Sequence, residues 1–150
     1  MTMSLESPGD TLAVQFGAAG AAVLHALIDT LIPPDDWPGG WEAGVADYLA
    51  RGFGAHLSSY VPTYMACLAS LSAEAQINYG RPFAGLEPAE RTALLEQLED
   101  EGRTIEWVIP PANFIRIANE HAAEGFYADP GNGGNKDGVA WKMIGFEVAG

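Results

Sequence analysis

The residues of this chain that could do chemistry are concentrated between His121 and Asp137. His121 and Glu124 lie three positions apart, a spacing that places both side chains on one face of a helix, where they could bind a metal or transfer a proton. Oxygen ligands suited to calcium follow on Asp129, Asn132, Asn135 and Asp137. Their spacing departs from the EF-hand pattern, and the terminal glutamate of that pattern is missing. A stand-alone metal-binding protein or enzyme using this region is therefore the alternative hypothesis.

The other reactive side chains do not form a recognisable catalytic pattern. His25 and His56 fall in separate predicted helices, without the HExxH spacing of a zinc site. Ser58 and Ser59 follow His56, but no GxSxG elbow is present. Cys67 is the only cysteine and lies among apolar residues, which predicts a buried, inert thiol and excludes an internal disulfide. We predict no catalytic residue, no metal ligand and no cofactor-binding residue on this chain.

A glycine-rich stretch follows the last of these helices, with the sequence GNGGNKDG from Gly131 to Gly138. It lacks the GxxxxGK[ST] spacing of a phosphate-binding loop, and it follows a helix where a dinucleotide fingerprint would follow a strand. Aromatic residues flank it on both sides, which favours a shaped surface that contacts another protein. The predicted partner-binding residues are Phe126, Tyr127, Asp129, Gly133, Gly134, Asn135, Trp141, Lys142 and Phe146.

Composition limits the class of protein. The chain has 150 residues, enough for one domain with one core, and 48% of them are hydrophobic. Its net charge of −13 repels phosphate backbones, so a nucleic-acid partner is not expected. No Lys or Arg precedes Arg51, so no export signal is recognised. The apolar run from Ala13 to Leu31 includes Gln15 and Asp29, which favours a buried amphipathic helix over a membrane span.

Apolar residues recur at helical spacing between prolines and glycines, and no stretch alternates as a half-buried strand does. We therefore predict an all-α fold: a single compact or partner-wrapping domain (10–150) of five to six helices with a Gly-rich C-terminal loop, after a disordered tail (1–9). The expected helices run from Asp10 or Thr11 to Leu31, from Trp41 or Glu42 through Leu57, from Tyr60 to Gly80, from Leu86 to Glu99 and from about Ala112 to Tyr127, with a further short one after the glycine loop.

Three segments of the chain carry recognisable motifs. The most specific segment is C-terminal: EGFYADP from Glu124, GGN from Gly133, DGV from Asp137, WK at Trp141 and IGF from Ile144. The weaker segments are LIPPDD from Leu31, followed by EAGV and DY, and YGRPF from Tyr79. Together they cover roughly residues 24 to 146, and their order resembles the gluconate 2-dehydrogenase subunit 3 family.

The resemblance implies a non-catalytic small subunit of a flavin-dependent sugar or sugar-acid dehydrogenase. It implies that a separate large subunit of the glucose-methanol-choline (GMC) oxidoreductase type holds the FAD and the catalytic residues, with a cytochrome c as a candidate electron acceptor of the complex. It also implies a periplasmic location, whereas the missing export signal leaves the cytoplasm as the alternative. No direct membrane span is expected, and the small subunit would stabilise and assemble its large partner.

Overall fold

The computed structural model describes residues 7–128, and all regular secondary structure in this part of the chain is helical, with no strand. Its elements are α1 (Pro8–Leu31), the π-helical turn η1 (Trp41–Val45), α2 (Ala46–Gly52), the 3₁₀ turn η2 (Ser58–Tyr60), α3 (Val61–Tyr79), the 3₁₀ turn η3 (Phe83–Gly85), α4 (Pro88–Glu99) and α5 (Pro111–Tyr127). The all-α prediction is confirmed. The expected glycine-rich loop and the short helix after it lie outside the described residues.

Prolines and a glycine set most helix boundaries. The first-turn position of Pro62 and the end of α3 at Gly80 were predicted, whereas α4 begins two residues after the predicted Leu86 and α5 begins one residue before the predicted Ala112. Pro62, Pro88 and Pro111 each occupy the first turn of a helix, where a missing backbone N–H is no loss. α3 ends at Gly80, whose φ of 71° is the left-handed conformation that glycine adopts without strain. These boundaries depend on the backbone preferences of single residues, which explains why they could be found without knowing the tertiary fold.

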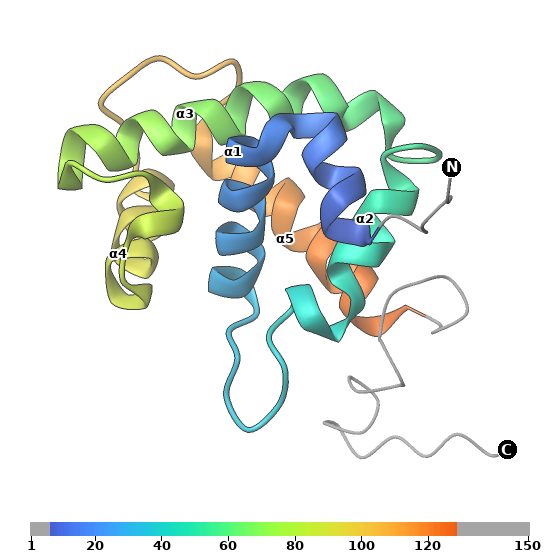
Figure 1. Cartoon of the computed structure of the whole chain (residues 1–150). Coiled ribbons are helices and arrows are strands. Elements are labelled where there is room, and N and C mark those ends of the chain that lie inside the picture. Colours follow the sequence, from blue (N-terminus) through green and yellow to red (C-terminus); the bar gives the residue numbers. More distant parts are fainter. Residues whose placement is uncertain (1–6, 129–150) are drawn as a thin grey trace, which may run out of the picture.

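Helix α1 begins earlier than expected and is sharply bent. Ser7, not Asp10 or Thr11, is its N-cap; the Ser7 hydroxyl accepts the Asp10 N–H, and the Asp10 carboxylate accepts the Ser7 N–H in return. Gly17 interrupts the helix with φ 79° and ψ 162°, a conformation that strains other residues. The two arms of α1 consequently point in different directions (Figure 1).

The bend bears on whether α1 could span a membrane. By length and composition α1 is apolar enough, with a mean hydropathy of 1.6 over its most apolar window. A span needs about 20 residues of continuous helix, and neither arm on its own reaches that length. Only 33% of this window is buried, so the sequence-based expectation of a buried helix holds for a minority of its residues.

The second predicted helix is shorter than expected, because α2 stops at Gly52 and does not continue to Leu57. The apolar spacing continued to Leu57 because that side chain is buried after a turn, not along a helix. Among the tryptophans of this region, Trp41 is half-buried and stacks on His25 with ring centroids 4.4 Å apart. Trp37 is 36% exposed in the loop before η1.

The core lies around α1, which contacts α2, α3, α4 and α5 (Figure 1). Its largest fully buried side chains are Tyr64, Phe83, Phe114, Leu12, Leu24, Leu27, Ile28, Leu49, Leu68, Leu71, Leu94 and Leu98. Tyr64 is in edge-to-face contact with Phe53 and Phe114, at centroid distances of 4.9 and 5.2 Å. The aromatic cluster thereby joins α3 to α5 and fixes the direction in which α5 leaves the core.

Candidate functional site

Polar side chains from α2 and α5 meet near the C-terminal end of α5. The Tyr48 hydroxyl donates to Glu124 Oε1 at 2.9 Å and lies 3.1 Å from His56 Nε2. His56 reaches Tyr48 because the chain turns back after Gly52, whose carbonyl accepts the Leu57 N–H at 2.7 Å. A Cβ at Gly52 would lie 2.8 Å from the Leu57 side chain, so a larger residue would force this turn open.

Tyr48 forms a hydrogen-bonded bridge between Glu124 and His56. Burial raises the pKa of Tyr48 to about 12, and the hydrogen bond to Glu124 and its negative charge add to the increase. Tyr48 therefore keeps its proton at neutral pH and donates it to the carboxylate. Its oxygen is left to accept from the Nε2–H of His56, which defines the proton position on that imidazole. The three side chains thus link α2, the turn after it, and α5.

His121 lies one helical turn before Glu124 on α5, but it contacts a different neighbour. The His121 side chain is 4% exposed, and its Nδ1 lies 2.8 Å from the Tyr64 hydroxyl. Burial lowers the pKa of His121, although the charges of Glu124 and Glu120 oppose the change. Burial likewise raises the pKa of Tyr64, so this hydroxyl stays protonated. A neutral imidazole with its proton on Nε2 accepts the Tyr64 proton at Nδ1.

The His121 and Glu124 pair of the alternative hypothesis is therefore divided between two tyrosine hydroxyls. Within residues 7–128, no group of three His, Cys, Asp or Glu side chains could hold a metal ion. The third histidine, His25, pairs with Asp29 at an Nε2–Oδ2 distance of 3.2 Å. Asp129 and Asp137, which the alternative hypothesis needs, lie outside the described residues. In the described part, His121 joins α5 to α3 and His56 joins the turn after α2 to Tyr48, whereas His25 pairs with Asp29 within α1.

Cys67 on α3 is buried, as predicted for an inert thiol. Burial raises the pKa of Cys67 to about 11, so the nucleophilic thiolate is scarce at neutral pH.

The end of α5 is held tightly against α2. Gly125 packs on the Tyr48 ring so closely that a Cβ would lie 3.0 Å from it. Phe126 is buried, and Tyr127 is 49% exposed with its ring edge-on to Phe126 at 5.1 Å. Of the predicted partner-binding residues, Tyr127 is thus available at the surface and Phe126 belongs to the core. The others, Asp129, Gly133, Gly134, Asn135, Trp141, Lys142 and Phe146, lie outside the described residues.

The bridge through Tyr48 was not predicted from the sequence, because its ends are 76 positions apart. Both residues lie in family-like segments, Tyr48 in DY and Glu124 in EGFYADP, but these segments do not show that the two side chains meet. The one available signal is Gly125 within the last turn of the predicted helix, which indicates the close approach of another element.

Removing the Tyr48 hydroxyl is expected to loosen the end of α5. In Tyr48→Phe, Glu124 loses its donor and His56 its acceptor, which lowers the free energy of unfolding by about 1 kcal/mol for a partly exposed bond. Amide hydrogen exchange in the last turns of α5 is expected to accelerate. Tyr79→Phe is the matched control, since the Tyr79 hydroxyl has no hydrogen-bond partner among the described residues. Equal exchange in the two variants would show that the bridge does not hold α5.

Comparison with known families identifies the chain. The family model described as gluconate 2-dehydrogenase subunit 3 matches residues 18–148, which is most of the sequence. The chain belongs to the gluconate 2-dehydrogenase subunit 3 family. No curated protein and no solved structure matches it. The resemblance seen in the sequence is therefore confirmed, and the match includes both the bridged end of α5 and most of the segment after it.

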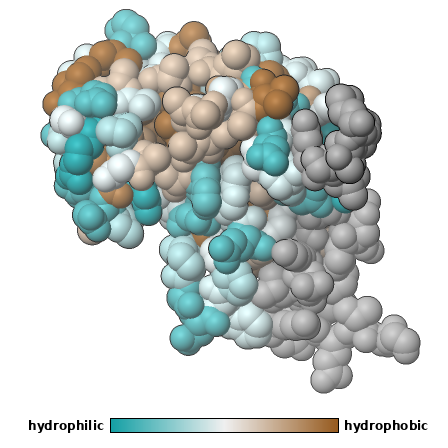
Figure 2. Space-filling model, viewed as in Figure 1, coloured by the Kyte–Doolittle hydropathy of each residue, from teal (hydrophilic) through white to brown (hydrophobic). Residues whose placement is uncertain are grey.

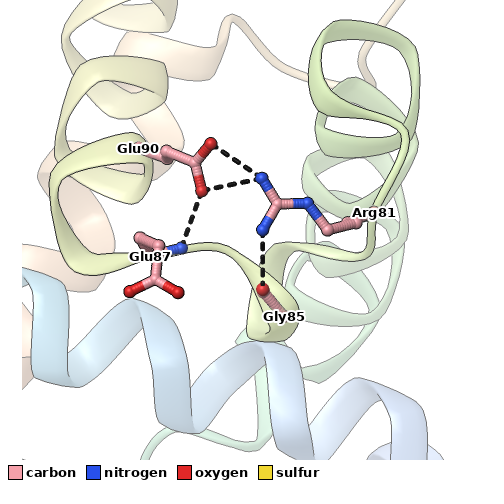
Figure 3. Close-up of polar contacts among 4 residues, drawn as sticks. All are labelled: Arg81, Gly85, Glu87 and Glu90. Atoms are coloured by element: carbon pink, nitrogen blue, oxygen red, sulfur yellow. Dashed lines mark hydrogen bonds and ion pairs between the residues drawn. The ribbon is translucent and has the colours of Figure 1, made fainter.

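In this member of the gluconate 2-dehydrogenase subunit 3 family, the family-like segment YGRPF from Tyr79 builds a clamp between α3 and α4. The guanidinium of Arg81 lies 2.9 and 2.7 Å from the two carboxylate oxygens of Glu90, and it donates to the Gly85 carbonyl at 3.4 Å (Figure 3). Glu90 also accepts the Glu87 N–H at 2.9 Å, which caps α4. The Glu87 N–H and Arg81 together lower the pKa of Glu90 against the effect of desolvation. The segment thus has a structural role.

Proposed function

We propose that this chain is the non-catalytic small subunit of a flavin-dependent dehydrogenase that oxidises a sugar or a sugar acid. Its role is to stabilise and assemble a larger GMC-type subunit, which holds the FAD and performs the chemistry. The observation that carries the proposal is the family match over residues 18–148, which includes the aromatic C-terminal segment.

The described structure supports a role in binding rather than in flavin chemistry. A dinucleotide is usually cradled where a strand passes through a glycine loop into a helix. Residues 7–128 contain no strand, so this part of the chain does not offer that cradle. The potential acid–base groups, His121 and Glu124, are engaged in contacts between helices. What α5 provides is a firm attachment for the segment that begins at residue 129.

That segment has the composition of an interface anchor. Trp141 and Phe146 follow the glycine-rich stretch, and Tyr127 is exposed just before it. Aromatic side chains supply most of the binding energy in many interfaces, and burying apolar area stabilises a complex by about 25 cal/mol per Å². Permanent complexes commonly bury more than about 2,000 Å² in total. The partner-binding residues predicted from the sequence, apart from the buried Phe126, are therefore retained as this proposal's anchors.

Truncation of Trp141 tests the proposal. In cells that express this chain together with the large flavin-dependent subunit of the same genome, Trp141→Ala is expected to weaken the complex by about 2 kcal/mol, close to 30-fold in affinity. Pull-down on the tagged small subunit, with dehydrogenase activity measured in the eluate, gives the result. Trp37→Ala is the matched control, because Trp37 is an exposed tryptophan in the loop before η1. Recovery of the large subunit and its activity unchanged by Trp141→Ala would contradict the anchor role.

The proposed complex is periplasmic, with a cytochrome c as its electron acceptor. Fractionation of cells that express both subunits tests the location, since recovery of the complex with cytoplasmic markers alone would contradict it.

A further inference from the structure

A second surface, formed by α1 and α3, has the properties of an interface. No Asp, Glu, Lys or Arg occurs between Thr11 and Ile28, which is most of α1. On α3 the only charged residue is Glu74, and its side chain is fully buried. In Figure 2 hydrophobic residues form a continuous area over the region where α1 and α3 lie in Figure 1. A face without charge is unusual on a chain whose net charge is −13.

A groove runs between the two helices on this face. Its volume is about 200 Å³, and its lining includes Phe16, Gly20, Val23, Met65, Leu68 and Ala69. Met65 is 51% exposed on the α3 side, whereas Val23 and Leu68 are buried at the groove floor. The groove begins beside the bend at Gly17, where α1 changes direction. It therefore presents a concave apolar surface between two rigid helices.

Exposed apolar surface of this kind is costly in water. Two-thirds of the most apolar window of α1 is not buried within the domain, and contiguous apolar patches on soluble proteins commonly mark interaction sites. Interface cores are also depleted of charged residues, since taking a charge out of water carries a large penalty. The α1–α3 face can be covered by another protein without burying any Asp, Glu, Lys or Arg of its own.

Three kinds of surface could cover the α1–α3 face: a second copy of the chain, a membrane or a different protein. The net charge of the chain distinguishes between them. A second copy of the chain would bring a further net charge of −13 close to the first, which disfavours self-association. An anionic membrane surface repels the same field, and the positive residues that bind its headgroups are missing from the chain before Arg51. A separate protein that presents an uncharged apolar surface meets neither obstacle.

We propose that the α1–α3 face, defined by the groove from Phe16 to Met65, is a second docking surface for the large oxidoreductase subunit. An apolar segment of that subunit fills the groove. This inference rests on the proposed function and deepens it, because it adds a contact region on the described helices to the aromatic anchors after residue 129. A groove of this size covers only part of a permanent interface, which is consistent with two contact regions on one small subunit.

A charge placed at the groove rim tests this surface. In co-expression with the large subunit, Met65→Glu is expected to reduce recovery of the complex at least about tenfold, because a carboxylate would be buried at the interface. Ala69→Glu, one turn further along α3, is expected to have the same effect. The matched control is Val108→Glu, which replaces a 66% exposed apolar side chain in the connection before α5. Thermal unfolding of each purified variant shows whether it is folded.

The outcomes separate this surface from the proposed function. If Met65→Glu and Ala69→Glu both lose the complex while Val108→Glu and the wild type keep it, the α1–α3 face is supported as a docking surface. Retention of the complex in folded Met65→Glu and Ala69→Glu overturns it and leaves the proposed function intact. Failure of the wild type to bind the large subunit overturns both. The purified wild type is expected to be monomeric by light scattering and not to sediment with anionic vesicles. If the wild type instead forms a dimer or binds vesicles, and Met65→Glu abolishes this, the face binds a second copy or a membrane. Either result overturns the proposal.

Discussion

Replacement of Glu74 by alanine is expected to lower the free energy of unfolding by about 3 kcal/mol or more. The Glu74 side chain is fully buried on α3, and its carboxylate accepts hydrogen bonds from the connection between α4 and α5. The donors are the backbone N–H of Thr104 at 2.9 Å to both oxygens, the backbone N–H of Ile105 at 3.3 Å and the indole N–H of Trp107 at 3.0 Å. Alanine would leave these donors without a partner, the buried indole of Trp107 included.

Two further variants test whether the loss of stability comes from the buried Glu74 carboxylate. Glu74→Gln keeps the size of the side chain, but it loses the charge and turns an amide N–H₂ toward other donors. The free energy of unfolding is therefore expected to fall by less than in Glu74→Ala, but still measurably. Glu99→Ala removes a carboxylate from the exposed acidic run at the end of α4 and is expected to change stability by less than about 0.5 kcal/mol. Urea unfolding gives the values. A Glu74→Ala loss no larger than that of Glu99→Ala would show that Glu74 does not hold the connection.

The contribution of Glu74 to the free energy of unfolding is expected to depend on pH in one direction. Burial favours the neutral form of Glu74, but the hydrogen bonds from Trp107, Thr104 and Ile105 outweigh it and lower the pKa of Glu74. A carboxyl group with a lowered folded-state pKa stabilises the fold above its unfolded value, about 4.3, and loses that contribution as the pH falls through the folded value. The stability difference between wild type and Glu74→Gln is therefore expected to shrink below about pH 4. A difference independent of pH would indicate that the carboxylate charge is unimportant.

The contacts of Glu74 illustrate what one sequence can and cannot predict. The end of α3 at Gly80 follows from the backbone preference of glycine and was predicted. Helix α4 begins at Pro88, two residues after the predicted start at Leu86. The partner of Glu74 could not be predicted, because Trp107 is 33 positions away and the pairing depends on how α3 and the connection pack. The sequence shows a single charged residue on α3, but it does not show which donors that carboxylate meets.

The same distinction applies to the errors in the helices. A glycine in an alanine-rich helix usually costs some stability without breaking the helix, so Gly17 carried no signal for the bend. Leu57 extended the apolar spacing of α2 because burial after a turn and burial along a helix give the same pattern. Boundaries set by local chemistry were therefore predictable, whereas the bend that borders the α1–α3 groove required the packed structure.

Replacement of Tyr64 by alanine is expected to be the other strongly destabilising change, with a loss of about 4 kcal/mol. Tyr64 is fully buried in the aromatic cluster, in contact with Phe53 and Phe114, and its hydroxyl lies 2.8 Å from His121 Nδ1. Alanine removes both the ring contacts and the hydrogen bond and leaves a cavity among these residues.

Tyr64→Phe separates the two contributions, because it keeps the ring and removes only the hydroxyl. The expected loss is about 1 to 2 kcal/mol, since the buried Nδ1 of His121 is left without a donor. Tyr60→Phe is the control, as it removes the hydroxyl of a partly exposed tyrosine that meets His121 only through its ring edge. Urea unfolding of the three variants gives the comparison, and equal losses for Tyr64→Phe and Tyr60→Phe would contradict the role of the buried hydrogen bond.

Tyr64→Phe also tests whether the way α5 is held affects binding to the large subunit. His121 lies on α5 one turn before Glu124, so the bond from Tyr64 and the bridge from Tyr48 together fix the direction in which α5 ends. If the end of α5 presents the C-terminal anchors to the large subunit, a folded Tyr64→Phe protein is expected to bind that subunit more weakly, although Tyr64 is buried and cannot touch it. Undiminished binding by the folded variant would show that the anchors do not depend on how α5 is held.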